Sequence, residues 1–197
     1  MQVLWSVAAG APAPRDSCPR QVTQGLRCVE GLANTWNELA GYERPLVLEM
    51  ITPERFAAEV LLLALDGLQA RVWRADGVHT VPLSELATVW TGRYRYLWRP
   101  PQGFEQALSR GDDSAAVAEV ASLFARLDGT EPPLAGARVT ASRETRVRLV
   151  QREHGLAEDG LVGRQTLLKL NAALGLDVTS QVAQARLEAS LAGGSNG

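Results

Sequence analysis

The residues best suited to chemistry near the N-terminus are two cysteines, Cys18 and Cys28, ten positions apart. A disulfide between them would close a short ring and stabilise the fold by about 3 kcal/mol. A catalytic thiol would instead need a histidine partner, and a metal site would need further ligands. The two histidines, His79 and His154, are distant in sequence and lack ligand-type spacing. Spacing alone favours the disulfide. The remaining alternatives are, in that order, two unconnected thiols, a catalytic nucleophile and a metal-binding pair.

A second group of polar residues lies in the segment 154–166, HGLAEDGLVGRQT. Asp159 can accept hydrogen bonds from the backbone ahead of it, and Gly160 can adopt a positive φ without steric cost. Gly163 and Thr166 lie where a following helix would begin. The pattern predicts a tight turn between two helices.

This turn and its flanking helices resemble the peptidoglycan-binding domain of many cell-wall proteins. The family pattern V-x-x-x-Q-x-x-x-G-L-x-x-D-G-x-x-G-x-x-T is matched by Val147, Gln151, Gly155, Leu156, Asp159, Gly160, Gly163 and Thr166. The resemblance implies that the turn borders a groove for muropeptide. The implied peptidoglycan-binding residues are Gln151, His154, Asp159, Gly160, Gly163, Arg164 and Thr166.

Those residues divide into two expected roles. Asp159, Gly160 and Gly163 are expected to hold the shape of the loop, and Gln151 can satisfy loop backbone groups instead of a glycan. His154 and Arg164 are polar residues beside the turn, which makes them the better candidates for ligand contact.

The elements that precede this segment are predominantly strands. Between residues 45 and 101, short runs rich in Val, Leu and aromatics are divided by Gly, Pro and Asp-Gly pairs. Two such pairs, Asp66-Gly67 and Asp76-Gly77, are hairpin-type turn signals. Short helices are expected at 18–26, at 34–39 and at 84–90, the last with Ser84 as N-cap. Arginines alternate with aromatics over 93–99, which predicts one solvated and one buried strand face.

From residue 112 onward the pattern becomes helical. Apolar residues at helical spacing predict helices over 112–129, 141–155 and 164–175, with Ser142 as the second N-cap, and a fourth helix over the tail. Leu149 is expected in the core. The predicted division is a domain of residues 1–110, a helical domain of residues 111–190 and a disordered tail of residues 191–197. The fold class is α+β: an antiparallel-sheet domain followed by a small three-helix domain.

Composition excludes several function classes. The formal net charge is −2, so no broad basic field exists to hold nucleic acid or an anionic membrane. No run of eighteen apolar residues is present, and the N-terminus lacks the basic start of a secretory signal. A protein of this sequence that works outside the cytosol is therefore expected to be a fragment without its export or anchoring segment.

An ordered series of features extends the resemblance to about residues 1–175. The series comprises Cys18, the motif G-L-R-C at 25–28, R-P-L-V-L at 44–48, A-E-V-L-L-L at 58–63, the segment 90–101 and the closing peptidoglycan-binding segment. It resembles the periplasmic region of the general secretion pathway protein A family. That resemblance implies a cytoplasmic ATPase and one membrane span outside this chain, and the absence of a P-loop motif here fits that division.

The first domain of that family resembles bacteriocin-processing, papain-like cysteine peptidases, in which a Cys nucleophile begins a helix and a His begins a strand. Cys18 occupies the nucleophile position, but Phe56 and Ala57 occupy the region of the histidine and cannot accept a proton. Asp76 lies close to the expected acid position but is displaced into a turn. We therefore expect a domain that is not an enzyme, and in an oxidising periplasm the pairing of Cys18 with Cys28 is favoured.

The function that the resemblance implies is a non-catalytic, peptidoglycan-binding periplasmic module of an inner-membrane-anchored type II secretion protein. It would help the outer-membrane secretin assemble across the cell wall. The implied partners are peptidoglycan, an inner-membrane protein B of the same pathway and the secretin, with a homo-oligomer as a further option and no cofactor or metal. The alternative is an active cysteine peptidase or cell-wall amidase whose base comes from elsewhere in the fold.

Overall fold

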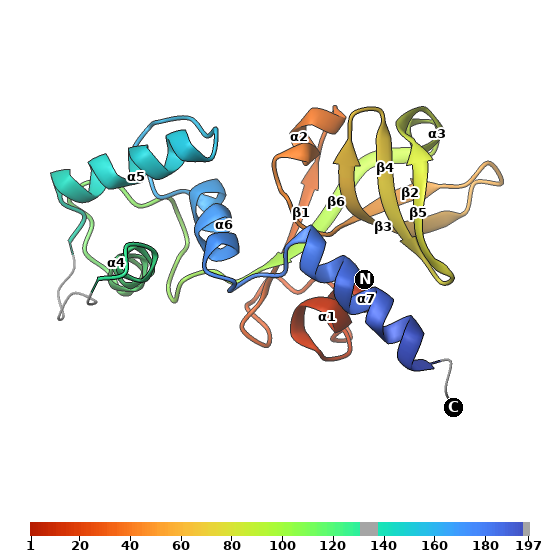
Figure 1. Cartoon of the computed structure of the whole chain (residues 1–197), viewed down its shortest axis with the longest axis horizontal. Coiled ribbons are helices and arrows are strands. Elements are labelled where there is room, and N and C mark those ends of the chain that lie inside the picture. The colour runs from red at the N-terminus through yellow and green to blue at the C-terminus, as the bar shows by residue number, and fades with distance from the viewer. Residues whose placement is uncertain (131–137, 195–197) are drawn as a thin grey trace. The chain divides into compact units, whose positions relative to one another are not determined.

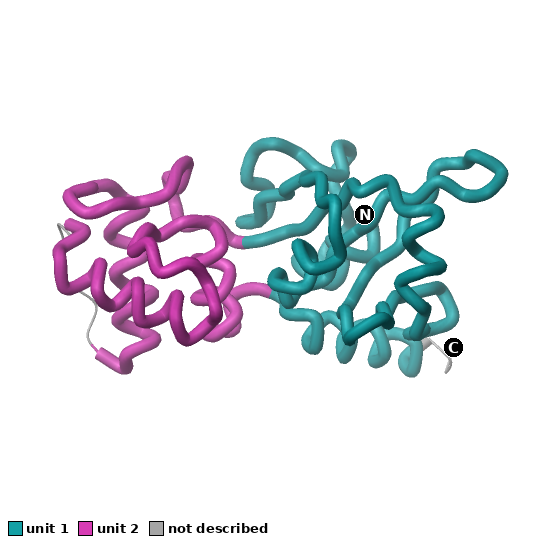
Figure 2. The backbone as a smooth tube through the Cα atoms, turned by 90° about the horizontal axis from the view of Figure 1, so that it is seen from above, with its two compact units in different colours: residues 1–98, 178–197 teal, residues 99–177 magenta. Residues whose placement is uncertain are grey.

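The chain folds into two compact units, which Figure 2 distinguishes by colour. The computed structural model describes residues 1–130 and 138–194. Unit 1 contains Met1–Trp98 and Val178–Gly197, and unit 2 contains Arg99–Asp177. Unit 2 is therefore inserted into unit 1, whereas the sequence predicted two successive domains divided near residue 110. None of the described helices is both long and apolar enough to span a bilayer.

Unit 1 is built on an antiparallel sheet whose strand order is β1-β6-β2-β3-β4-β5 (Figure 1). Its strands are β1 (Arg27–Leu32), β2 (Leu46–Ile51), β3 (Ala57–Asp66), β4 (Gln69–Arg74), β5 (Gly77–Pro82) and β6 (Trp90–Trp98). The predicted α+β class with an antiparallel sheet is confirmed. Both Asp-Gly hairpins are confirmed too, because Asp66 pairs with Gln69 and Arg74 pairs with Gly77 across two-residue loops.

Two helices from opposite ends of the chain cover one face of this sheet (Figure 1). They are α1 (Gln2–Ala9) and α7 (Ser180–Gly194). The core between helices and sheet contains Trp5, Leu63 and Leu187, together with Cys28 of β1. The predicted fourth helix therefore exists, but it packs on the sheet because its apolar residues Ala183 and Leu187 are buried there. Of the predicted disordered tail, residues 191–194 belong to α7 and residues 195–197 lie outside the described part.

The alternation along β6 gives the two faces of the sheet different chemistry. Arg95 donates to three carboxylates, those of Glu30, Glu49 and Glu59, at 2.8, 3.4 and 2.8 Å. On the other face, Tyr94 and Tyr96 are buried and the Tyr42 ring packs against both of them. The predicted alternation of solvated and buried side chains is confirmed for residues 93–96 only, because Leu97 lies on the same face as Arg95 and is buried in the core under α1 and α7.

Two short helices lie between the strands, and their starts differ from the predicted ones. α2 (Trp36–Ala40) is capped by Thr35, whose side chain and backbone form a capping box with Glu38. α3 (Leu83–Ala87) has Pro82 at its N-cap position, because Ser84 already lies inside the helix. The helix predicted over 18–26 is wrong. That segment consists of bends, a turn and an isolated bridge between Thr23 and Leu26, and its one cysteine, Cys18, is bonded to Cys28 of β1.

The disulfide between Cys18 and Cys28 fixes the segment that precedes the sheet. The two Cα atoms are 5.1 Å apart, within the range that an unstrained bridge requires. Cys28 is buried in the core and Cys18 packs against the same cluster. The Trp5 indole also donates to the carbonyl of Ser17 at 2.8 Å. The segment is therefore tied to β1 and to α1, and the predicted pairing is confirmed.

Unit 2 contains the three predicted helices. They are α4 (Ala115–Leu127), α5 (Ala141–Glu153) and α6 (Arg164–Ala173). Ser114 caps α4 by accepting from the backbone of Val117. The cap of α5 is Thr140 rather than Ser142, because the Thr140 hydroxyl accepts from the backbone of Arg143.

The boundary of unit 2 is set by hydrogen bonds between its two ends. The backbone N–H of Arg99 donates to Asp177 Oδ1 at 2.9 Å, and Asn171 donates to the carbonyl of Arg99 at 2.7 Å. Asn171 also donates to Asp177 Oδ2 at 3.2 Å, and both side chains are buried. Residues 99–113 lack helical periodicity, so the sequence placed most of them with the sheet, whereas these contacts hold them in unit 2.

We predict that the disulfide contributes about 3 kcal/mol to the free energy of unfolding of unit 1, through the lost freedom of the unfolded chain. The variant Cys18→Ala/Cys28→Ala and the reduced wild type should both unfold at lower urea concentration than the oxidised wild type. Tryptophan fluorescence during urea denaturation measures the difference. Reductant should leave the unfolding midpoint of the double variant unchanged. If reductant also leaves the midpoint of the wild type unchanged, the assignment is contradicted.

Candidate functional site

The site predicted from the D-G-x-x-G pattern is organised by one buried amide, that of Gln151 near the end of α5. Its Nε2 donates to Asp159 Oδ1 at 2.7 Å, to the carbonyl of Leu161 at 3.0 Å and to Thr166 Oγ1 at 3.2 Å. Its Oε1 accepts from the backbone N–H of Gly160 at 2.9 Å. One side chain thus joins the end of α5, the turn and the first turn of α6.

Asp159 completes the turn by bonding the backbone ahead of it. Its Oδ1 accepts from the N–H of Leu161 at 2.9 Å as well as from Gln151. The carboxylate therefore receives one hydrogen bond from the loop backbone, which is the role expected from an Asp-Gly pair, and one from α5. Leu149, expected in the core, is instead exposed on α5.

Gly160 lies where the turn passes closest to α5. Its φ is 73°, in the left-handed region that favours glycine. A Cβ at this position would lie 2.9 Å from Glu144 Cγ and 3.0 Å from the guanidinium carbon of Arg148. Arg148 occupies this place because it donates to the carbonyl of Glu158 and, at 2.8 Å, to Glu144 Oε1. Arg148 therefore covers the turn and leaves space at position 160 for a glycine but not for a residue with a Cβ.

The turn is also attached to the segment that begins unit 2. Leu108 and Val162 form an antiparallel bridge, with backbone N–H to carbonyl distances of 3.2 and 2.9 Å. Gly163 follows with extended backbone and is the N-cap of α6. Thr166 lies inside α6, so its hydroxyl serves the Gln151 network and does not cap the helix.

The structure therefore separates the predicted binding residues into two groups. Gln151, Asp159, Gly160 and Thr166 meet in one hydrogen-bond network, and Gly163 begins the helix beside it. The two remaining residues are exposed: His154 is the C-cap of α5 and Arg164 is the first residue of α6. The network fixes the positions of the helix ends that carry them.

The ion pairs that close the loop were missed from sequence. Arg152 donates to Glu158 through Nε and Nη2, at 3.0 and 2.6 Å. This contact lowers the pKa of Glu158 below its ordinary value and raises that of Arg152. The spacing of Glu144 and Arg148 is the favourable i, i+4 pairing on one helix face, and it could have indicated their contact.

The region that resembles a peptidase active site has no thiol, since both cysteines of the chain form the disulfide. His79 donates from Nε2 to Asp76 Oδ1 at 2.8 Å, and this bond lowers the pKa of that carboxyl. The pair lies on β5 and its hairpin, at the opposite edge of the sheet from Cys28 in β1. Five strand spacings separate the edges, about 24 Å along the sheet. His154 belongs to unit 2.

In residues 1–130 and 138–194, no three His, Cys, Asp or Glu side chains come together in a way that could hold a metal ion.

Comparison with known proteins shows what the chain is similar to. A periplasmic domain of the EpsAB fusion protein of the Vibrio vulnificus type II secretion system has a similar structure, with a TM-score of 0.62 and 27% sequence identity. The similarity covers 91% of this chain and 79% of that domain. No family model matches the chain.

A sequence relative agrees with this structural similarity. General secretion pathway protein A of Aeromonas hydrophila is 28% identical over 160 residues, which are 81% of this chain. The chain spans only 28% of that protein's length. The resemblance predicted from the sequence is therefore confirmed.

We predict that Gly160→Ala destabilises unit 2 by about 1 kcal/mol more than Gly155→Ala. Both glycines have a positive φ, so each variant carries the strain of about 1 kcal/mol that a side chain meets there. Only at Gly160 must the new methyl also displace Arg148 and Glu144, since the space around Gly155 is open. Urea denaturation of both variants measures the difference. Equal losses of stability would show that Arg148 does not constrain the turn.

Proposed function

We propose that this chain is a non-catalytic periplasmic module that binds peptidoglycan and helps a type II secretion system assemble its outer-membrane secretin across the cell wall. Two similarities support the proposal: to a periplasmic domain of a type II secretion protein and to a general secretion pathway protein A. The periplasmic location and the attachment to an inner-membrane anchor are part of the same proposal.

The observation that carries wall binding is the division of polar groups around the turn. Gln151 and Thr166 are buried and hydrogen-bond to groups of the loop. His154 and Arg164 are exposed at the adjoining helix ends. Muropeptides offer carboxylates, for which a guanidinium is a strong hydrogen-bonding partner, and sugar hydroxyls that an imidazole can bond. We propose Arg164 and His154 as the contacting residues and Gln151, Asp159, Gly160, Gly163 and Thr166 as the residues that hold them in place.

Such a site is expected to bind each wall fragment with modest affinity. A few exposed side chains around a rigid turn provide little buried surface, and the ordering of a ligand opposes binding. The wall presents many copies of the same unit, so several modules held together would gain from avidity. This suits a protein that must remain near the wall while a channel assembles, together with an inner-membrane protein B partner and the secretin.

The disulfide favours the non-catalytic proposal over the alternative of a cysteine peptidase or amidase. Nucleophilic catalysis requires a thiolate, and Cys18 has no thiol while it is bonded to Cys28. The imidazole of His79 bonds Asp76 as a catalytic base bonds its orienting acid, but it lies at the other edge of the sheet. Reduction of the disulfide would therefore not bring a base to Cys18.

Wall binding should weaken when both exposed side chains are removed. We expect the wild type to sediment with purified peptidoglycan sacculi, and His154→Ala/Arg164→Ala to bind about tenfold more weakly, as the loss of charge-assisted hydrogen bonds implies. The matched control is Arg126→Ala, which removes an exposed arginine from α4. Binding that is equal in all three proteins would refute these contacts, and a wild type that stays in the supernatant would refute the function.

Labelling with iodoacetamide tests the proposed inactivity. The native protein should not be labelled without reductant, because both sulfur atoms are bonded, and it should take up two labels after reduction in denaturant. Mass spectrometry of the intact protein counts the labels. Rapid labelling of Cys18 in untreated protein would support the peptidase alternative instead.

A further inference from the structure

The carboxylate of Asp159 has one oxygen that the hydrogen-bond network of the turn leaves unused. Its Oδ1 accepts from Gln151 Nε2 at 2.7 Å and from the N–H of Leu161 at 2.9 Å. An ionised carboxylate has about four lone-pair sites, so these two donors leave the capacity of the second oxygen, Oδ2, intact. Within residues 1–130 and 138–194, no hydrogen bond or ion pair reaches Oδ2, and Asp159 is exposed.

The arginines that cover the turn are already paired with other carboxylates. Arg148 donates to Glu144 Oε1 at 2.8 Å. Arg152 donates to Glu158 through Nε and Nη2, at 3.0 and 2.6 Å. Asp159 therefore keeps a negative charge that forms no ion pair in the described part of unit 2. A ligand that carries a positive charge would complete this arrangement.

The hydrogen bonds at Oδ1 also determine which kind of cation fits Asp159. A guanidinium binds a carboxylate most strongly through both oxygens, as two parallel hydrogen bonds. Here Oδ1 already accepts from two donors of the protein, so a ligand is limited to a single-point contact at Oδ2. An ammonium is a compact charge with three rotatable donors, which suits such a contact. The geometry therefore favours a primary ammonium over an arginine side chain.

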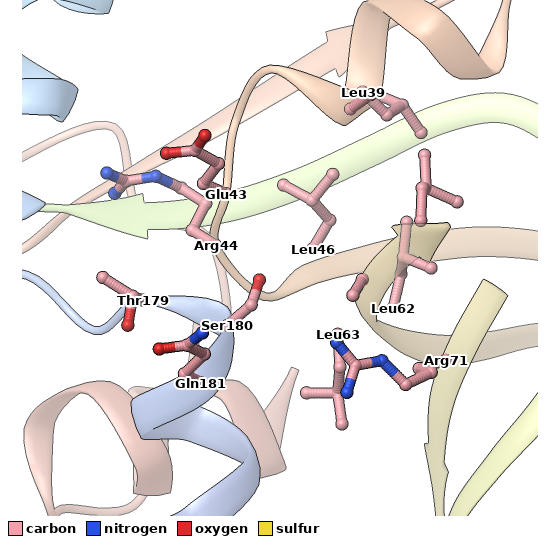
Figure 3. A pocket seen from close by; sticks show the side chains of 13 residues that line it. Leu39, Glu43, Arg44, Leu46, Leu62, Leu63, Arg71, Thr179, Ser180 and Gln181 are labelled. Atoms are coloured by element: carbon pink, nitrogen blue, oxygen red, sulfur yellow. The ribbon is translucent and has the colours of Figure 1, made fainter. Parts of the chain in front are cut away.

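A pocket of about 410 Å³ in unit 1 differs from the turn in this respect (Figure 3). Its lining includes four leucines that are almost fully buried and offer little apolar surface to a ligand: Leu39, Leu46, Leu62 and Leu63. Its two arginines are bonded within unit 1, since Arg71 donates to Gln184 Oε1 at 3.1 Å and Arg44 to the carbonyl of Leu97 at 3.2 Å. Oδ2 of Asp159, in contrast, accepts from none of the described residues.

We propose that Asp159 Oδ2 accepts from the free ammonium of a wall stem peptide, at its diamino acid where that residue is not cross-linked. The inference rests on the proposed wall binding and names the group that is recognised. Gln151 and Leu161 fix the carboxylate before the ligand arrives, so little side-chain freedom is lost on binding. A diamino diacid also carries a carboxylate, which is the group proposed above for Arg164.

The test combines a variant of the protein with a modified wall. Asp159→Asn keeps an Oδ1 that can accept both hydrogen bonds and replaces Oδ2 with an amide nitrogen, so the turn should keep its stability. The variant should bind native sacculi about fivefold more weakly than the wild type, as one exposed charge-assisted contact implies. Acetylation of the amino groups of the sacculi should weaken binding of the wild type by the same factor and leave binding of the variant unchanged. Sedimentation over a range of sacculus concentrations measures the four affinities.

The matched control is Asp113→Asn, which removes an exposed carboxylate of unit 2 outside the turn. It should bind native sacculi as the wild type does, and urea denaturation should show that both variants remain folded. The comparison of native with acetylated sacculi uses the wild type, so it decides the question even if Asp159→Asn is destabilised.

Two results would overturn the ammonium contact while wall binding stands. One is equal binding of the wild type to native and acetylated sacculi, and the other is an equal loss of binding in Asp113→Asn and Asp159→Asn. Displacement of the wild type from sacculi by Nα-acetyl-lysinamide, at the concentration of the wall amino groups, would assign Oδ2 to lysines of any origin and overturn its assignment to the wall. A wild type that sediments with neither kind of sacculus would overturn both this contact and the proposed function.

Discussion

The arrangement of α5, the turn and α6 in unit 2 depends on the hydrogen bonds of the Gln151 side chain. A buried amide must satisfy its donors and acceptor within the protein, and here those partners belong to the turn and to α6. The turn cannot move away from α5 without leaving these groups unpaired in a place that water does not reach. The helix ends that carry His154 and Arg164 are thereby held in place, which would lower the entropy cost of the proposed binding.

The disulfide imposes a comparable constraint on unit 1, with a chemical consequence. A bond between Cys18 and Cys28 ties a segment without regular structure to the core, and it consumes the only sulfur atoms that could act as nucleophiles. The same residues that resemble a peptidase site therefore stabilise the fold.

Because unit 2 is inserted into unit 1, the sheet of unit 1 is covered by helices from both ends of the sequence. α1 and α7 are separated by most of the sequence, yet they pack together on one face of the sheet. The hydrogen bonds among Arg99, Asn171 and Asp177 bring the two ends of unit 2 together. The chain therefore re-enters unit 1 close to the residue at which it left, and α7 is held on the sheet by its own buried residues, Ala183 and Leu187.

The sequence by itself determined what depends on near neighbours: both Asp-Gly hairpins, the alternation over residues 93–96 of β6, three helices of unit 2 and the turn whose spacing marks its family resemblance. It missed α1, β1 and the insertion, because these depend on contacts between residues far apart in the chain. Only the tertiary structure decided that the Gln151 amide bonds groups of the loop and that the tail helix packs on the sheet of unit 1. Local spacing fixes backbone geometry over a few residues, whereas burial and charge at a site are set by whichever distant segments pack there.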